Sequence, residues 1–225
     1  MPSLSYSALV LAVSEINELT SAHPTAGAII PTALSRVLGR ASVVLLSSHF
    51  ERYFYAINEE AVTFLNSCGL TGERVPETLR LVHSKQPISE IEQTSWENRS
   101  RSLAEFISTD AWLWGTGVTG SLEHQRILAW MKAPKPESLV RFYRYWGIQD
   151  IFAAITRRPT TRGSLRLLVQ ELVDKRNNIA HGDFSAQATR SDVRRYSHTV
   201  LTFCERADRV FARELRRLSG TTVPW

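Results

Sequence analysis

An arginine and a histidine lie five residues apart in the last quarter of the chain, in the run Arg-Asn-Asn-Ile-Ala-His-Gly that begins at Arg176. The guanidinium of arginine is permanently charged and can bind a phosphate through two donors. The imidazole of histidine gives or takes a proton near neutral pH. The pair formed by Arg176 and His181 therefore indicates chemistry on a phosphodiester.

The segment that carries this pair predicts an amphipathic helix over residues 164–181. Arg176 falls on the apolar stripe of that helix, four residues after Leu172 and seven after Val169, so its side chain is expected to point inward. Because burial of an unpaired guanidinium is costly, we expect the side chain to meet a carboxylate, a phosphate or backbone carbonyls.

His181 is expected on a different face of the same helix. At 100° per residue it lies about 140° from Arg176, whereas Asn177 lies only about 40° from His181. A regular helix would direct His181 toward a groove or a second subunit, with Asn177 placed to orient the imidazole or to donate to the phosphate. Gly182 offers a helix stop, so the last turn could instead unwind and bring the imidazole closer. The sequence leaves both arrangements open.

Glu51 is the predicted partner of Arg176. It follows Phe50, a member of an apolar stripe with spacings of three and four that predicts one long helix over residues 32–67. A helix of this length would form the spine of a bundle, and Glu51 lies one step around it from the core. The alternative is a purely structural ion pair between Arg176 and Glu51 that joins two helices.

The rest of the chain also has helical patterns. We expect a first helix over residues 7–19, short amphipathic pieces over 76–107 interrupted by Pro87, and helices over 122–131, 136–146 and 192–218. No repeat or convincing β-hairpin is present. The sequence predicts an all-α helical bundle with a long second helix and additional short helices in the middle region. Residues 1–225 are expected to form one domain, with 70–135 a helical insertion or connecting region.

Charge is distributed unevenly along the chain. Residues 1–138 carry a net charge of −3 and residues 139–225 a net charge of +8. The part that contains Arg176 and His181 is thus the cationic one, which suits an anionic partner such as RNA. The alternative is that the arginines of 192–218 form the solvated face of a terminal helix.

Several other kinds of chemistry are not indicated. Cys68 and Cys204 are far apart and form no CxxC pattern, so we expect neither a disulfide framework nor a zinc site. The carboxylates do not cluster as a two-metal nuclease would require. The run from Gly115 to Gly120 satisfies a dinucleotide-binding pattern, but no clear strand precedes it, so we interpret it as a flexible connection. We expect no metal and no cofactor.

No signal peptide or membrane span is expected. The residues before the apolar run at 9–13 are not basic, Glu15 interrupts that run, and no stretch approaches about 18 apolar residues. We expect a cytoplasmic protein.

Three segments of the chain resemble the RiboL-PSP-HEPN group of helical domains. The spacing of Arg176 and His181, with a polar residue directly after the arginine, is similar to the HEPN signature. Residues 40–52 resemble the long second helix of that group, where an aromatic residue followed by glutamate is usual. Residues 136–152, which end in Tyr-Trp-Gly-Ile-Gln-Asp-Ile-Phe, are similar to its connecting segment.

The resemblance implies a function. Members are helical ribonucleases and RNA-associated domains, and an acidic residue placed like Glu51 is associated with their active site. The group typically dimerises through the face that carries the motif, which would bring two copies of Arg176 and His181 around one phosphate. We therefore expect a metal-independent endoribonuclease of a bacterial conflict system, acting as a toxin or phage-defence effector, with RNA and a second subunit as partners.

Two alternatives remain from the sequence. One is a non-catalytic helical module that binds RNA or a partner protein, and the other is a nucleotide-binding enzyme that uses Gly115 to Gly120. The chain also departs from one branch of the group, because Asp183 stands where toxins paired with nucleotidyltransferase antitoxins carry tyrosine. An antitoxin or other conflict-system partner remains possible, but that pairing is not predicted.

Overall fold

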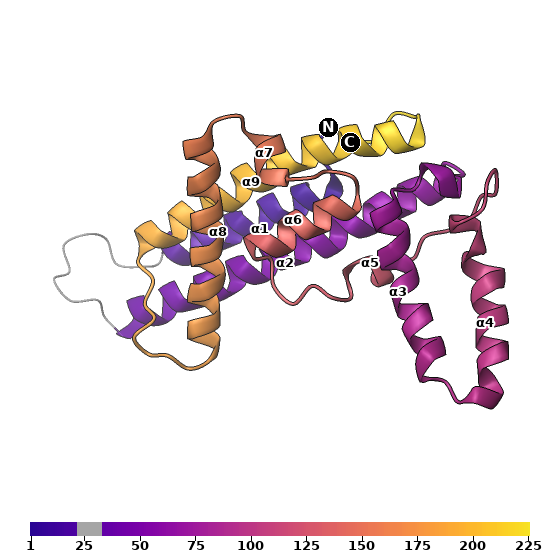
Figure 1. Cartoon of the computed structure of the whole chain (residues 1–225). Helices are drawn as coiled ribbons and strands as arrows, with labels where there is room; N and C mark the ends of the chain where they lie inside the picture. Colours follow the sequence, from indigo (N-terminus) through magenta and orange to yellow (C-terminus); the bar gives the residue numbers. More distant parts are fainter. Residues whose placement is uncertain (22–32) are drawn as a thin grey trace.

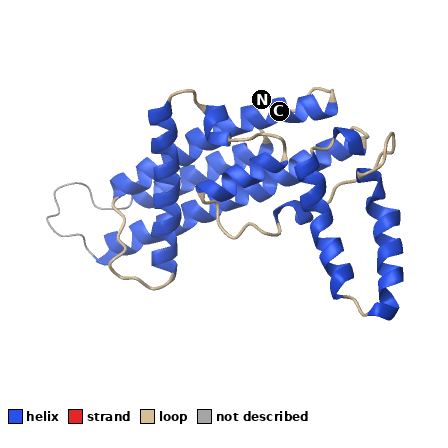
Figure 2. Cartoon of the chain, in the orientation of Figure 1, coloured by secondary structure: helices blue, strands red, loops and turns tan. Residues whose placement is uncertain are grey.

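The computed structural model describes residues 1–21 and 33–225. Within these residues the chain forms nine α-helices and two short 3₁₀ helices, with no strand (Figure 2). The prediction of an all-α protein is confirmed. None of the described helices is both long and apolar enough to cross a membrane.

The long helices form the body of the molecule (Figure 1). They are α1 (Leu4–Ser21), α2 (Ala33–Ser67), α8 (Pro159–Ala180) and α9 (Arg190–Ser219). Helix α2 packs against α1, α8 and α9, and α8 runs across the other helices in the view of Figure 1. The predicted long second helix is therefore present, and it supports the helix that carries Arg176.

Shorter elements connect these helices. They are η1 (Gly72–Arg74), α3 (Glu77–Gln93), α4 (Trp96–Asp110), η2 (Ala111–Leu113), α5 (His124–Leu128), α6 (Pro136–Tyr145) and α7 (Ile151–Ile155). Helices α3 and α4 extend together away from the body in Figure 1. One cluster of buried apolar residues includes side chains of both the long helices and this middle region. The assignment of residues 1–225 to one domain stays a prediction.

The prediction that Pro87 interrupts the helical segment was wrong. Pro87 lies inside α3, which continues to Gln93. Proline removes only one backbone donor of a helix, while packing of an apolar face supplies most helical stability in a protein. The first half of α3 buries Leu79, Val82 and His83, and this packing offsets the local cost of the proline.

Residues 115–120 form a loop between η2 and α5, as the sequence predicts. No strand precedes them in the described chain and no helix starts within them. The structural context that a dinucleotide-binding motif requires is therefore missing.

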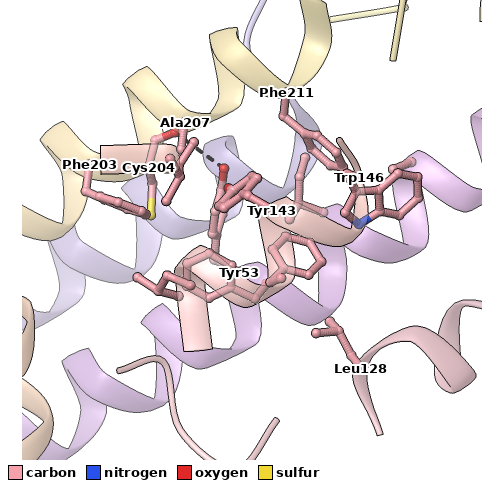
Figure 3. Close-up of a cluster of buried hydrophobic side chains, with 14 of the residues drawn as sticks. Tyr53, Leu128, Tyr143, Trp146, Phe203, Cys204, Ala207 and Phe211 are labelled. Atoms are coloured by element: carbon pink, nitrogen blue, oxygen red, sulfur yellow. Dashed lines mark hydrogen bonds between the residues drawn. The ribbon is translucent and has the colours of Figure 1, made fainter. Parts of the chain in front are cut away.

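Aromatic side chains fix the rotation of α2 about its axis (Figure 3). The ring of Phe54 packs edge-on against Phe50 and Phe142, with centroid distances of 5.2 and 5.9 Å. The neighbouring Tyr53 is buried, and its hydroxyl donates to the carbonyl of Cys204 on α9 at 3.4 Å. Because these residues face the core, Glu51 must lie at the border between the core and the surface.

Polar contacts hold both halves of α8. In the first half, Arg166 pairs with Asp150 at 2.8 Å, and the Asp150 carboxylate caps α7 by accepting from the amides of Phe152 and Ala153. Near the end of α8, Lys175 lies 3.8 Å from Asp192, which forms a capping box with Thr189 at the start of α9. The helix that carries Arg176 is thus bound to its neighbours along both halves.

Candidate functional site

Helix α8 ends directly at the motif. Ala180 is its last residue and His181 is the C-cap. The amide of Gly182 donates to the carbonyl of Ile179 at 3.1 Å, and the amide of Asp183 donates to that of Asn178 at 3.0 Å. These two bonds are a Schellman motif, which requires the left-handed conformation that Gly182 adopts with φ +85°. The helix is regular up to His181, so its last turn is not unwound.

Arg40 on α2 binds the loop that follows α8. Its Nη1 atom donates to the carbonyl of Asp183 at 2.6 Å and to that of Ala186 at 3.3 Å. Its Nη2 atom donates to the carbonyl of Ile179 at 3.5 Å. A cation at the C-terminal end of a helix is favourable because the last carbonyls carry partial negative charge. Arg40 therefore fixes the backbone on both sides of His181.

Gly39 allows this loop to approach α2. A Cβ atom on Gly39 would lie 2.1 Å from the carbonyl oxygen of Ala188, far inside van der Waals contact. The two adjacent residues of α2 thus have complementary roles, because Gly39 makes room for the loop and Arg40 binds it.

The carboxylate of Asp183 is satisfied within its own loop. It accepts from the amide of Ser185 at 2.8 Å and from its hydroxyl at 2.6 Å. These hydrogen bonds, chiefly that of the hydroxyl, lower the pKa of Asp183 below its ordinary value. The negative charge that the sequence places near the motif is therefore engaged in a turn next to Arg40.

Arg176 is half-buried and lies near Glu51, the residue proposed from the sequence as its partner. Burial raises the pKa of the Glu51 carboxyl above its ordinary value, and the positive charge of Arg176 lowers it by less. The two side chains are therefore close enough to interact, although no ion pair within 4 Å joins them among the described residues. In the part of the chain that the structure describes, the side chain of Arg176 has one hydrogen-bond acceptor, the Oδ1 atom of Asn177 at 3.2 Å.

The side chain of Asn177 has a different hydrogen-bond partner from the one expected. The sequence suggests that Asn177 orients His181 or donates to a phosphate, whereas its side-chain oxygen holds the guanidinium. Among residues 1–21 and 33–225, Asn177 is the one acceptor of Arg176, so most donors of the guanidinium have no partner there and can bind a phosphate. Asn177 would then set the direction in which the guanidinium points.

His181 is exposed at the end of α8. Because α8 is regular up to this residue, the offset of about 140° from Arg176 holds. Within one chain the imidazole and the guanidinium thus point in different directions. His49, two residues before Glu51, does not join them, because it lines a hollow between α1 and α2 with Leu9 and Arg52.

An exposed aromatic residue lies three positions after His181. Phe184 is 85% exposed, and the guanidinium of Arg40 lies 5.5 Å from the centroid of its ring. A contiguous patch of exposed apolar side chains marks a surface that a ligand or a partner covers. Leu34 and Val37, on the first turns of α2, are also exposed.

Sequence reasoning missed the roles of Arg40, Gly39 and Phe184. A small residue followed by arginine, within a segment matched to the second helix, was a signal for the first two. Among residues 1–21 and 33–225, no group of three or more His, Cys, Asp or Glu side chains is placed to hold a metal ion.

The comparisons with known proteins give one result. The model of the RiboL-PSP-HEPN family matches residues 7–213, which include every residue of the site described above. The chain belongs to the RiboL-PSP-HEPN family. No curated protein and no solved structure matches it. The RiboL-PSP-HEPN match covers the middle region as well, so α3, α4 and α5 lie within the matched range.

Proposed function

We propose that this RiboL-PSP-HEPN protein is a metal-independent endoribonuclease whose active site is completed by a second subunit. The observation that carries the proposal is the hydrogen bonding of Arg176. Its guanidinium lies near Glu51 and donates to Asn177, while most of its donors have no partner among the described residues. A half-buried guanidinium with free donors is suited to bind phosphoryl oxygens, and its charge is most effective where water is scarce.

The chemistry would use the 2′-hydroxyl of RNA as nucleophile. One group removes the proton of that hydroxyl, and a second group protonates the departing 5′-oxygen. The 2′-oxygen forms a bond to phosphorus while the bond to the 5′-oxygen breaks, which leaves a 2′,3′-cyclic phosphate and a 5′-hydroxyl. Each chain supplies one motif histidine, so two copies of His181 would take the two roles.

The position of His181 supports the composite site. It is exposed and about 140° around α8 from Arg176, so one chain does not direct both side chains at the same point. In a symmetric dimer the His181 of each subunit can face the Arg176 of the other. The exposed residue Phe184, three positions after His181, is an apolar group that such a contact would cover.

Glu51 would position Arg176. Its charge attracts the guanidinium from the α2 side while Asn177 binds it from α8. With two supports on different helices, the guanidinium loses less freedom when it binds a phosphate. The purely structural ion pair that the sequence left open would instead leave Arg176 bound to Glu51 alone.

Cleavage of total RNA in EDTA by the wild type, Arg176→Ala and His181→Ala tests the proposal. We expect the wild type to release products with 2′,3′-cyclic phosphate and 5′-hydroxyl ends, and each variant to be at least about 100-fold slower. Asn178→Ala is a matched control, because Asn178 is exposed between the two residues. Equal RNA binding by all variants, with cleavage by none of the proteins, would instead support the non-catalytic RNA-binding module.

The conflict-system role rests on the family alone. We propose a toxin or phage-defence effector that is held inactive by an antitoxin or another regulatory partner. Growth arrest on expression of the wild type, and normal growth on expression of equal amounts of His181→Ala, is the expected result. Equal growth with both proteins would count against a toxic activity under those conditions.

A further inference from the structure

Two adjoining hollows lie beside α3, α5 and α6, outside the site described above. The first, of about 410 Å³, is lined by residues of all three helices, among them Lys85 and Arg126. The second, of about 330 Å³, is lined by Lys132, Lys135 and other residues of the α5–α6 connection and of α6. Trp130 and Arg141 line both hollows. We call the two together the α5–α6 groove.

The α5–α6 groove is rich in unpaired positive charge. Five cations line it and two glutamates oppose them: Lys85, Arg126, Lys132, Lys135 and Arg141 against Glu90 and Glu137. Only Arg126 forms ion pairs within the described chain, with Asp110 and Glu123. The other four cations are available to an anionic ligand. This positive charge stands out, because residues 1–138 carry a net charge of −3.

One of these cations is stacked on aromatic rings. The guanidinium of Arg141 lies 4.2 Å from the centroid of the Trp130 ring and 5.6 Å from that of Tyr145. Its Nε atom donates to the Tyr145 hydroxyl, and the indole of Trp130 donates to the carbonyl of Ile127 at 2.8 Å. The guanidinium is thus oriented in advance, and within the described chain its two terminal nitrogens have no hydrogen-bond partner, so they can bind a phosphate.

The α5–α6 groove is connected to the candidate active site through α2. The hydroxyl of Tyr55 donates to the carbonyl of Met131 at 2.8 Å, so the connection between Trp130 and Lys132 is bound to α2. Tyr55 lies one helical turn beyond Glu51, about 6 Å along the axis. Burial, and after it the charge of Glu51, raises the pKa of Tyr55 above its ordinary value, so the two side chains interact. In Figure 1 the α5–α6 connection lies between α3 and α8.

We propose that the α5–α6 groove binds a single-stranded flank of the RNA that is cleaved at Arg176 and His181. The inference rests on the proposed function and names the part of the protein that holds the substrate beside the scissile bond. Cations interleaved with an aromatic ring suit a single strand, whose phosphates and unstacked bases are both accessible. Lys132, Lys135 and Arg141 contact phosphates in this arrangement.

The first test measures binding without cleavage. The full chain with His181→Ala is titrated with a fluorescently labelled, mixed-sequence single-stranded RNA of 12 nucleotides, and the Kd is followed from 50 to 200 mM salt. The triple change Lys132→Ala, Lys135→Ala and Arg141→Ala in the same chain is expected to weaken binding about tenfold at low salt. The slope of log K against log salt should fall by about 2, since each single-strand phosphate contact contributes about 0.7.

A charge-matched control uses cations outside the groove. It carries three changes on α9: Arg206→Ala, Arg213→Ala and Arg216→Ala. These residues have no ion pair among the described residues, and their removal lowers the net charge equally. The inference requires that the groove variant loses clearly more RNA affinity than the α9 control variant. Equal losses of RNA affinity in the two variants would show diffuse attraction to a basic surface and would overturn the inference. Absence of RNA binding by the His181→Ala chain would also overturn it.

A second test separates the groove from the chemistry. In the wild-type background, the groove variant is compared with the wild type on a long RNA and on a dinucleotide that is too short to reach the groove. We expect KM for the long RNA to rise about tenfold with kcat unchanged, and cleavage of the dinucleotide to stay the same. Unchanged KM for the long RNA, with cleavage intact, would overturn the groove and leave the proposed ribonuclease standing.

Discussion

The guanidinium of Arg40 donates to the main-chain oxygen of Asp183 at 2.6 Å, across 143 positions of the sequence. This contact joins the first turns of α2 to the residue two places after His181. The loop that carries the candidate catalytic histidine is therefore held by tertiary contacts and not by its own sequence alone.

Removal of the Arg40 side chain should loosen that loop. Arg40→Ala deletes hydrogen bonds to the carbonyls of Ile179, Asp183 and Ala186, and we expect a loss of about 1–2 kcal/mol in the free energy of unfolding. Amide hydrogen exchange of residues 181–188 should become faster. Arg36→Ala, an exposed change on the same helix, is the control. If exchange in 181–188 is equal in both variants, Arg40 does not hold the loop.

A methyl group at Gly39 should be poorly tolerated. Gly39→Ala would place Cβ at 2.1 Å from the Ala188 oxygen, so the backbone must move, at a cost of about 1–3 kcal/mol. Gly163→Ala on α8 is the matched control, because its Cβ meets no atom within 4 Å. That change should stabilise by about 0.5–1 kcal/mol. Urea unfolding of both variants measures the difference, and two equal midpoints would contradict the predicted contact.

Replacement of Glu51 should change how stability depends on pH. The pKa of Glu51 is raised in the folded chain, mainly by burial, so the folded state holds its proton more tightly than the unfolded state does. The stability this group contributes is fully present below the unfolded pKa of about 4.5 and is lost as pH rises through the folded value. The stability of the wild type relative to Glu51→Gln should therefore fall as pH rises through this window.

Thermal unfolding of the two proteins between pH 4 and pH 8 tests this sign. Cleavage should also fall in Glu51→Gln, because Arg176 loses the charge that attracts it. An unchanged difference in melting temperature across the range would show that burial does not perturb Glu51.

A buried histidine far from the site gives the opposite pH dependence. Burial, and after it the charge of Arg126, lowers the pKa of His83 from 6.5 to about 4. Its Nε2 atom accepts from the amide of Glu123 at 2.9 Å, which requires the neutral ring. Between pH 6.5 and about 4 the unfolded chain takes up a proton that the folded chain excludes, so stability is lost as pH falls.

The shift of His83 corresponds to a loss of about 3 kcal/mol over that interval. His83→Gln keeps an acceptor for the Glu123 amide and does not titrate, so its stability should fall less on acidification than that of the wild type. Denaturant unfolding at pH 7, 5.5 and 4.5 gives the comparison. Parallel pH profiles for the two proteins would refute the neutral buried state.

A charge at Phe184 should weaken the proposed dimer. Phe184→Asp places a carboxylate on the surface that a second subunit would cover, next to the His181 of the same chain. We expect a higher proportion of monomer by sedimentation and a parallel loss of cleavage. Trp96→Asp, at a side chain that is 78% exposed on α4, is the control. A Phe184→Asp protein that dimerises like the wild type would place the subunit contact elsewhere.

The long-range part of the site could not be read from the sequence. The predicted helix over 32–67 and the inward-leaning positions of Glu51 and Arg176 on their helices follow from apolar spacing, which sets the face of each residue. The contacts of Arg40 are to backbone carbonyls, and any residue supplies a carbonyl, so no residue type marks the acceptor. Helix α7 was not predicted because it has five residues, too few for periodicity, although Asp150 is a capping signal before it.

The hydrogen-bond partner of Asn177 could not be predicted from the sequence either. Helical geometry correctly places Asn177 on the same stripe as His181, but its side chain is long enough to reach either Arg176 or His181. In the structure its oxygen accepts from the Nη1 atom of Arg176 at 3.2 Å.

Arg40 and Glu51 lie on one uninterrupted helix, and this restricts the insertions and deletions that the helix can accept between them. They are eleven positions apart, which is about three turns of α2, so both side chains face α8. One inserted residue between them would rotate one contact by about 100° relative to the other and detach either the loop or the guanidinium. Substitutions on the exposed side of this stretch are compatible with the site, whereas insertions and deletions within it are not.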